Sequence, residues 1–226
     1  MAISTGKAEV RGYIGNSMLN GFSLVDAVGK GTVQVVKNHP DWPNPYNGIT
    51  EIRRGDIDTD IGLYLAESEQ RSCALAAGTL ISGILCKSAG GYLVEQLPGC
   101  DKQGTLVKCI EQNLADLVAQ DASESPPSNL FVSGITPLDM ISRIFQGSEW
   151  TILGEMEPVY KCSCNSDRLL RSLRLLPKEE VIQIIAEQGM IEARCHFCGH
   201  VYTMEPDEMM NKLQKVESID PSRDAL

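Results

Sequence analysis

Four cysteines near the C-terminus constrain this chain more than any other feature of its sequence. Cys162 and Cys164 form a CxC pair, and Cys195 and Cys198 form a CxxC pair that is followed by Gly199. Structural zinc takes four tetrahedral ligands, commonly paired at short spacing, and thiolates are typical of closed sites. A glycine after the second pair leaves room for a tight backbone reversal around two metal-bound sulfurs. The spacing therefore predicts one tetrathiolate site that binds one Zn²⁺ ion.

The stretch between the two pairs has the pattern of a small clamp. Pro177 suits the first turn of a helix that ends at Gly189. Ile191 and Ala193 then alternate with polar residues as a strand leading into the second pair, and residues 201–203 can return as its partner. The apolar face of the expected helix consists of Val181, Ile182, Ile184 and Ile185.

The spacing alone leaves the role of the metal open. An inert zinc staple is the commonest use of four-cysteine sites, and two unrelated thiol pairs are a further alternative. A redox role is permitted, because zinc holds its cysteines as thiolates, the reactive form, and each pair is close in sequence. Oxidation to two local disulfides would remove every ligand and unfold a module that depends on the metal.

The two histidines beside the second pair, His196 and His200, are expected to be exposed or to contact the ligands rather than to bind the metal. The chain has neither the His-x-Glu nor the Pro-Cys-x-x-Cys pattern of a zinc deaminase. A closed shell of four thiolates also leaves no position for a catalytic water. We therefore expect no enzymatic activity and no catalytic residues.

The other cysteines and the N-terminus bear on the compartment. Residues 1–7 are short and polar and lack the features of a signal peptide, so we expect a reducing compartment, the cytoplasm or the interior of an organelle. The four remaining cysteines lack ligand-like spacing and are expected to be buried free thiols: Cys73, Cys86, Cys100 and Cys109.

The charge and hydropathy pattern excludes two classes of partner. The net charge is −10 and no dense Lys/Arg face is present, which argues against nucleic acid. No apolar run approaches the ~18 residues that a membrane span needs, so we expect no membrane partner.

The first half of the chain reads as an α+β domain. Residues 8–14, 31–37, 48–53, 73–86 and 91–97 have the pattern of strands, and residues 60–70 and 104–119 have that of helices. The stretch 120–138 is rich in serine and proline and predicts a linker, followed by a short helix over 137–146. We therefore expect a core domain over 1–119, a helical linker region over 120–159 and a small zinc-binding module over 160–226.

Several stretches resemble one known family, the redox-regulated 33 kDa chaperonins (heat shock protein 33). The resemblance covers nearly the whole chain, although family members carry a sizeable segment before the strand at Glu9–Ile14 that this chain is expected to lack. The stretches that carry it are Tyr64–Gln70, Ala89–Gly99, Tyr160–Cys164, Leu176–Val181, Ile185–Gly189 and Cys195–Gly199.

The resemblance implies a holdase that is inactive when zinc-bound and active after oxidation. By position, Cys162 would then pair with Cys164, and Cys195 with Cys198. The linker would unfold and offer an apolar surface to unfolded client proteins. These clients would later pass to downstream foldase chaperones. The oxidised chain would form a homodimer. The proposed client-binding residues, which would be covered in the reduced protein and exposed afterwards, are Leu138, Ile141, Ile144 and Phe145. From the residues alone, a thiol–disulfide oxidoreductase and a redox-inert zinc-ribbon interaction module remain as alternatives.

Overall fold

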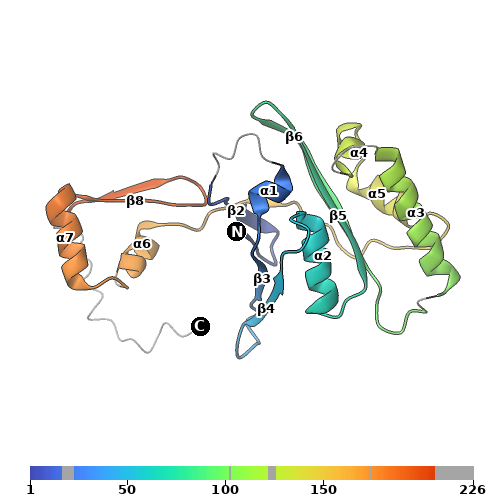
Figure 1. Cartoon of the computed structure of the whole chain (residues 1–226), viewed down its shortest axis with the longest axis horizontal. Helices are drawn as coiled ribbons and strands as arrows, with labels where there is room; N and C mark the ends of the chain where they lie inside the picture. Colours follow the sequence, from blue (N-terminus) through green and yellow to red (C-terminus); the bar gives the residue numbers. More distant parts are fainter. Residues whose placement is uncertain (17–22, 102, 122–125, 174, 207–226) are drawn as a thin grey trace. The chain divides into compact units, whose positions relative to one another are not determined.

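The structure, a computed structural model, describes residues 1–16, 23–101, 103–121, 126–173 and 175–206 (Figure 1). The chain forms two compact units. The described residues of Met18–Ile152 form the large unit, and those of Met1–Ser17 and Leu153–Leu226 form the cysteine unit. Both contain helices together with mainly antiparallel strands, which confirms the predicted α+β class.

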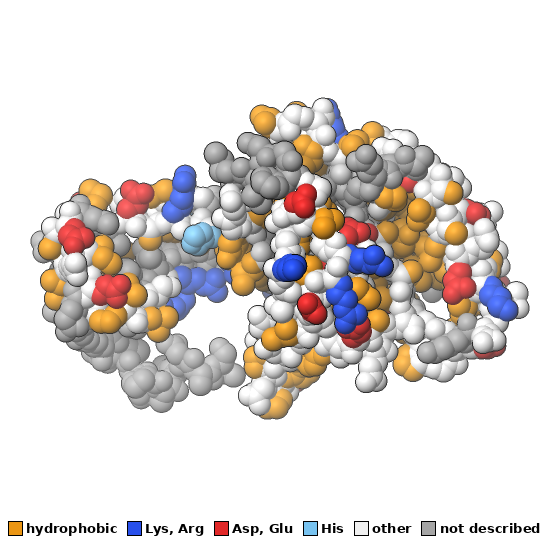
Figure 2. All heavy atoms as spheres, in the orientation of Figure 1, with side chains coloured by type: hydrophobic (Ala, Val, Ile, Leu, Met, Phe, Trp, Pro, Cys, Tyr) orange, Lys and Arg blue, Asp and Glu red, His pale blue; other side chains and the backbone are white. Residues whose placement is uncertain are grey.

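Two antiparallel hairpins supply the strands of the large unit. β3 (Thr32–Lys37) pairs with β4 (Tyr46–Glu51), and β5 (Cys73–Ser82) pairs with β6 (Leu85–Glu95). We predicted that the last strand begins only at residue 91, but it begins at Leu85. The reason is that Gly83, with φ of +60°, allows a tight turn inside the apolar run. The end of this hairpin carries exposed hydrophobic side chains (Figure 2). Among them, Ile84 is 99% exposed.

The helix α2 (Ile57–Glu67) packs on β3, β4 and β5, and the short helix α1 (Leu24–Val28) precedes β3. Asp60 in α2 is 3% exposed and accepts hydrogen bonds from three backbone amides, those of Arg53 at 3.0 Å, Arg54 at 3.1 Å and Gly55 at 2.7 Å. Burial raises the pKa of Asp60, but these amides outweigh it, so the net pKa is lowered. This carboxylate ties the loop after β4 to the helix.

The core of the large unit lies where three helices meet the β5–β6 hairpin. The helices are α3 (Thr105–Asp121), α4 (Ser128–Val132) and α5 (Pro137–Ile144), and α5 lies beside α3 while α4 packs on both strands of the hairpin. Gly90 allows this packing, because a Cβ there would lie 2.5 Å from the Phe131 ring. The buried core residues are Leu117, Leu130, Met140 and Ile144.

The predicted linker is well structured where the structure describes it. α3 continues to Asp121, α4 lies inside the stretch 120–138, and both α4 and α5 share the core with α3. Residues 128–132 of the predicted linker thus form a helix, and Leu130 is buried there. The division into core, linker and zinc module remains a prediction, and the compact units divide the chain elsewhere.

The cysteine unit begins with a three-stranded sheet. β1 (Ala2–Ser4) pairs antiparallel with β2 (Glu9–Gly12), and β2 pairs parallel with β7 (Val159–Tyr160). The first predicted strand, assigned to the N-terminal core domain, therefore pairs with the segment that leads into Cys162.

The rest of the cysteine unit contains α6 (Ser166–Leu173), α7 (Lys178–Gln188) and the hairpin of β8 (Ile191–Arg194) and β9 (Val201–Met204). The predictions of α7, β8 and β9 are confirmed, whereas β1 and α6 were not predicted. On α7, Val181 is buried as expected, but Ile182 is 56% exposed. Among the described residues, none of the helices is long and apolar enough to cross a membrane.

Candidate metal centre

The four C-terminal cysteines are brought together by β7 and by the β8–β9 hairpin. Cys162 and Cys164 follow β7 directly, and Cys195 and Cys198 lie in the turn between β8 and β9. The Cys195 amide donates to the His200 carbonyl at 2.8 Å, and the Gly199 amide donates to the Cys195 carbonyl at 2.9 Å. Gly199 has φ of +72°, the left-handed conformation that glycine adopts without strain. The expected role of this glycine in a tight knuckle turn matches the observed backbone.

The four sulfurs form a compact cluster of the size that zinc requires. All four lie within 4.8 Å of one another, with Cys162 Sγ 3.6 Å from Cys195 Sγ and Cys164 Sγ 3.4 Å from Cys198 Sγ. A tetrahedral site with Zn–S bonds of about 2.3 Å has S···S edges of about 3.8 Å. The residues therefore fit one tetrahedral metal ion. Among the described residues, this is the one group of three or more potential ligands found that close together, and it contains neither histidine of this stretch.

The ionisation of these thiols explains why a cation belongs among them. The Cys164 backbone amide and the neighbouring thiols lower the pKa of Cys162 to about 6, against the effect of burial. The His200 backbone amide lowers the pKa of Cys198. The hydrogen bond between the Cys198 and Cys164 thiols, the burial of Cys198 and its hydrogen bonds with the other two thiols outweigh this effect and raise the pKa to about 12. Cys162 therefore ionises easily and Cys198 only with difficulty, because the Cys198 thiol shares hydrogen bonds with neighbouring sulfurs and is partly shielded from water. A bound cation is what allows all four to ionise together.

Two tyrosines support the cluster. The Tyr202 hydroxyl donates to Cys164 Sγ at 3.1 Å, and this hydrogen bond is the main reason why the pKa of Tyr202 rises to about 12. The Tyr160 hydroxyl donates to the backbone carbonyl of Phe197, between the two cysteines of the CxxC pair. Each tyrosine therefore links one segment of the site to another.

The N-terminal strand β2 also holds the site, which the sequence reasoning missed. The Arg11 guanidinium lies 4.5 Å from the centre of the Phe197 ring and donates to Ser163 Oγ at 2.8 Å. The Tyr13 ring meets the Phe197 ring edge-on at 5.0 Å. Ser163 and Phe197 are the residues inside the CxC and CxxC pairs, so β2 contacts both. No local pattern predicts this, because Arg11 and Ser163 are 152 positions apart.

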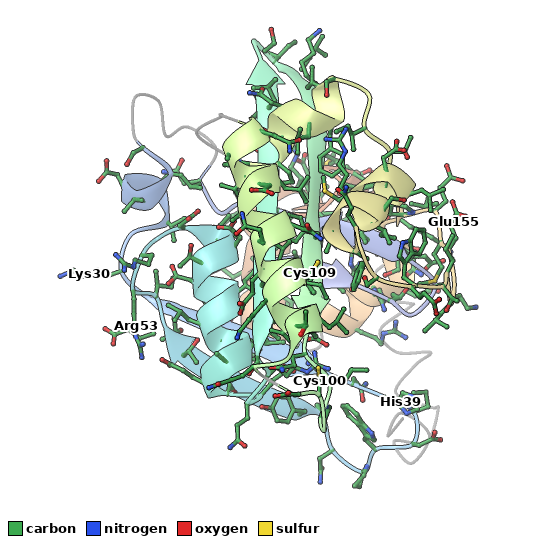
Figure 3. The ribbon with its side chains drawn as sticks, turned by 90° about the vertical axis from the view of Figure 1, so that its right-hand side faces the viewer. Lys30, His39, Arg53, Cys100, Cys109 and Glu155 are labelled. Atoms are coloured by element: carbon green, nitrogen blue, oxygen red, sulfur yellow. The ribbon has the colours of Figure 1, made fainter. Side chains whose placement is uncertain are left out.

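The other four cysteines lie in the large unit and form no disulfide. Cys73 and Cys109 are partly buried, but Cys86 and Cys100 are exposed, so the expectation of buried thiols is wrong for these two. Figure 3 shows Cys109 on α3 and Cys100 in the loop that precedes it. The Cys109 thiol donates to the Gln146 carbonyl at 3.3 Å, and burial raises the pKa of Cys73. These thiols are separate contacts rather than one cluster.

The four residues predicted to bind clients lie on different sides of their segment. Ile144 is 2% exposed and belongs to the core, and Phe145 is partly buried against that core. Leu138 is 48% exposed and Ile141 is 37% exposed. These two are therefore exposed in the folded chain, although we expected all four to be covered. The reason is the helical period: Met140 and Ile144 are four residues apart and share the buried face of α5. Client binding by these residues remains a prediction.

Comparison with known proteins gives one consistent result. A family model described as "Hsp33 protein" matches residues 1–205. The 33 kDa chaperonin of Desulforamulus reducens is 32% identical over 226 residues, covering 96% of this chain and 73% of the relative. That of Bacillus licheniformis is 33% identical over 218 residues, covering 92% and 72%. The crystal structure of the 33 kDa chaperonin from Thermotoga maritima is similar with a TM-score of 0.78 and 29% identity, over 96% of this chain and 73% of that one.

Proposed function

The chain belongs to the Hsp33 family of chaperones, and from this premise we propose that it is a redox-regulated holdase whose switch is the cluster of four C-terminal cysteines. As a chaperone of this family it binds unfolded client proteins. The observation that carries the proposed switch is the compact arrangement of the four sulfurs, which lie within 4.8 Å of one another.

In the reduced state, Cys162, Cys164, Cys195 and Cys198 hold one zinc ion as thiolates. Zinc is the metal that best suits four thiolates in tetrahedral positions, and it supplies a positive charge without redox chemistry of its own. Among the described residues of the cysteine unit, the buried hydrophobic residues are few, namely Leu170, Val181 and Met204. A core this small does not hold a module together by itself, so folding of the unit depends on metal binding.

Oxidation converts the four thiolates into two disulfides. With hydrogen peroxide, each pair of thiolates gives one disulfide and two hydroxide ions, so two peroxide molecules accept the four electrons. Both disulfides together remove all four ligands from the metal. We propose the pairs Cys162–Cys164 and Cys195–Cys198, which the family resemblance supports. In the reduced arrangement the short S···S distances of 3.4 and 3.6 Å join cysteines of different pairs, so peptide mapping of the oxidised protein is the direct test of this pairing.

Loss of the metal then exposes apolar surface to clients. We propose that residues 120–159 act as the linker and that α5 leaves the core after the cysteine unit unfolds. Its release would add the buried side chain of Ile144 and the partly buried ring of Phe145 to the exposed side chains of Leu138 and Ile141. A continuous apolar surface of this kind is typical of binding sites for unfolded chains.

Further properties follow from the same proposal. The oxidised chain forms a homodimer and passes its clients to foldase chaperones, and the reduced chain resides in the cytoplasm, where thiols persist. A closed shell of four thiolates also supports a role without enzymatic turnover.

The test measures zinc content and suppression of client aggregation, before and after treatment with peroxide at mild heat. Zinc release together with new holdase activity, both reversed by reductant, is the expected result. Zinc that stays bound, or that leaves without any gain in activity, would identify the site as an inert structural staple. Turnover of a dithiol substrate by the metal-free protein would identify a thiol–disulfide oxidoreductase instead.

A further inference from the structure

A cavity lined by arginines lies beside the cysteines of the metal centre. Its volume is about 290 Å³, and its wall includes Arg11 of β2, Arg168 of α6 and Arg194 of β8 together with Cys164 and Cys195. Among the described residues, no aspartate or glutamate belongs to this wall. Three side chains with permanent positive charge therefore share one small space.

These arginines have no carboxylate partners in the part of the chain that the structure describes. Lys161, a basic residue of the same unit, forms an ion pair with Glu9 at 2.5 Å, and Arg53 and Arg71 of the large unit are also paired with glutamates. Arg11, Arg168 and Arg194 form no ion pair with any described residue. What distinguishes the three from other unpaired basic residues is that they line one cavity, so their positive charges add up in one place.

Two of the guanidinium groups meet at one oxygen. Arg11 Nη1 donates to Ser163 Oγ at 2.8 Å, and Arg168 Nη1 donates to the same atom at 2.5 Å. Like charges this close repel each other unless an anion lies between or beside them. Each guanidinium has five N–H donors, so both retain donors for a further acceptor. Asn165 marks the start of α6 on the same wall, and its side chain accepts from the Arg168 amide at 2.8 Å. The positive end of that helix therefore faces the same region.

The charge of the metal site accounts for only part of this cluster. Four thiolates with one Zn²⁺ carry two negative charges, whereas the three arginines carry three positive charges. One positive charge remains unbalanced when the site is loaded, and Arg168 and Arg194 are exposed to solvent. We propose that the cavity binds a small phosphate-like oxyanion, because the planar fork of a guanidinium matches the oxygens of such a group. The proposal rests on the folded, metal-loaded unit of the proposed function, but it does not require that oxidation releases the metal.

Binding would connect three segments of the metal centre. The anion would join β2, the first turn of α6 after the CxC pair and the end of β8 before the CxxC pair. A ligand that binds the folded unit and not the unfolded chain stabilises it by mass action. The reduced, zinc-loaded protein should therefore resist thermal unfolding and zinc loss better in phosphate than in chloride of equal ionic strength.

The experiment is a calorimetric titration of the full zinc-loaded chain, in reductant, with inorganic phosphate at constant ionic strength. We expect saturable binding at one site per chain, weakened at least about tenfold by Arg168→Gln because one charged fork is lost. Arg171→Gln is the matched control, because Arg171 is exposed on the same helix and does not line the cavity. Zinc content and far-UV circular dichroism of both variants should equal those of the parent.

Three results would overturn the inference. The first is no saturable phosphate binding by the parent. The second is equal affinity in the parent and in Arg168→Gln. The third is equal loss of phosphate affinity in Arg168→Gln and in the control Arg171→Gln, which would mean that the general charge of the unit, and not the cavity, attracts the anion. If Arg168→Gln does not fold, Arg194→Gln removes a charge from the opposite part of the wall and is judged by the same criteria.

Discussion

Truncation of Ile144 to alanine should destabilise the large unit strongly, because this side chain fills the core at the end of α5. It is 2% exposed and packs in one cluster with Leu117 of α3, Leu130 of α4 and Met140 of α5. Removing a buried isoleucine side chain leaves a cavity, since neighbours on three helices cannot all move in to fill it. Such substitutions cost 2–5 kcal/mol, and we expect about 3–4 kcal/mol here.

The assay is thermal unfolding of the reduced, zinc-loaded protein, followed by far-UV circular dichroism and repeated in urea. For a unit of this size, 1 kcal/mol corresponds to about 3–4 °C, so the midpoint should fall by about 9–16 °C. The matched control is Leu138→Ala on the same helix. Leu138 is 48% exposed, and its truncation leaves no cavity, so the expected cost is about 1 kcal/mol or less.

Equal midpoints for the two variants would refute the assignment of Ile144 to the core. A second consequence follows if α5 is released on activation. Ile144→Ala should then suppress client aggregation after milder oxidation than the parent requires, because less free energy holds α5 in place.

Four further outcomes are expected. Cys195→Ser should abolish tight zinc binding even in reductant, because three thiolates cannot close the shell; unchanged zinc stoichiometry and affinity would remove the assignment. Asp60→Asn should cost about 2–4 kcal/mol near neutral pH, since backbone amides lose a charged acceptor. The folded-state pKa of Asp60 is lowered, so its contribution is present above the unfolded-state value of about 4 and is lost as pH falls through the folded-state value. Urea titrations from pH 7 to pH 3 should show the difference between variant and parent shrinking. Gly90→Ala should cost about 1–3 kcal/mol, measured by the same titration, because its methyl group would lie 2.5 Å from the Phe131 ring. Ile141→Asp should weaken client capture by the oxidised protein without changing zinc content, and equal aggregation suppression would count against this surface.

The metal centre and the elements next to it show what short-range sequence pattern can specify. The CxC and CxxC spacing, Gly199 and the alternation around Ile191 predict ligands, turn and strand, because each depends on residues within a few positions. The structure contains the β8–β9 hairpin and a cluster of the four cysteine sulfurs. The α3 helix was likewise predictable from its apolar period, apart from its last turn.

Burial on α5 was harder to predict, because a short helix can turn either of two apolar sets toward the core. Leu138 and Ile141 form one set, and Met140 and Ile144 form the other. The second set is buried, since it packs in one cluster with Leu117 of α3 and Leu130 of α4. The hydrophobic pattern establishes that α5 is amphipathic, but the neighbouring helices decide which side is covered.

The sequence by itself therefore determined the family, the α+β class and which four cysteines could bind one metal ion. Each of these depends on residue spacing over a few positions or on stretches that relatives share. Only the tertiary structure decided that the N-terminal strand β2 pairs with β7, and that Arg11 contacts both Ser163 and Phe197. It also decided that three arginines from separate elements meet in one cavity. Contacts between segments more than a hundred residues apart produce no repeating hydrophobic pattern or short motif in the sequence. They are therefore seen only in the folded chain.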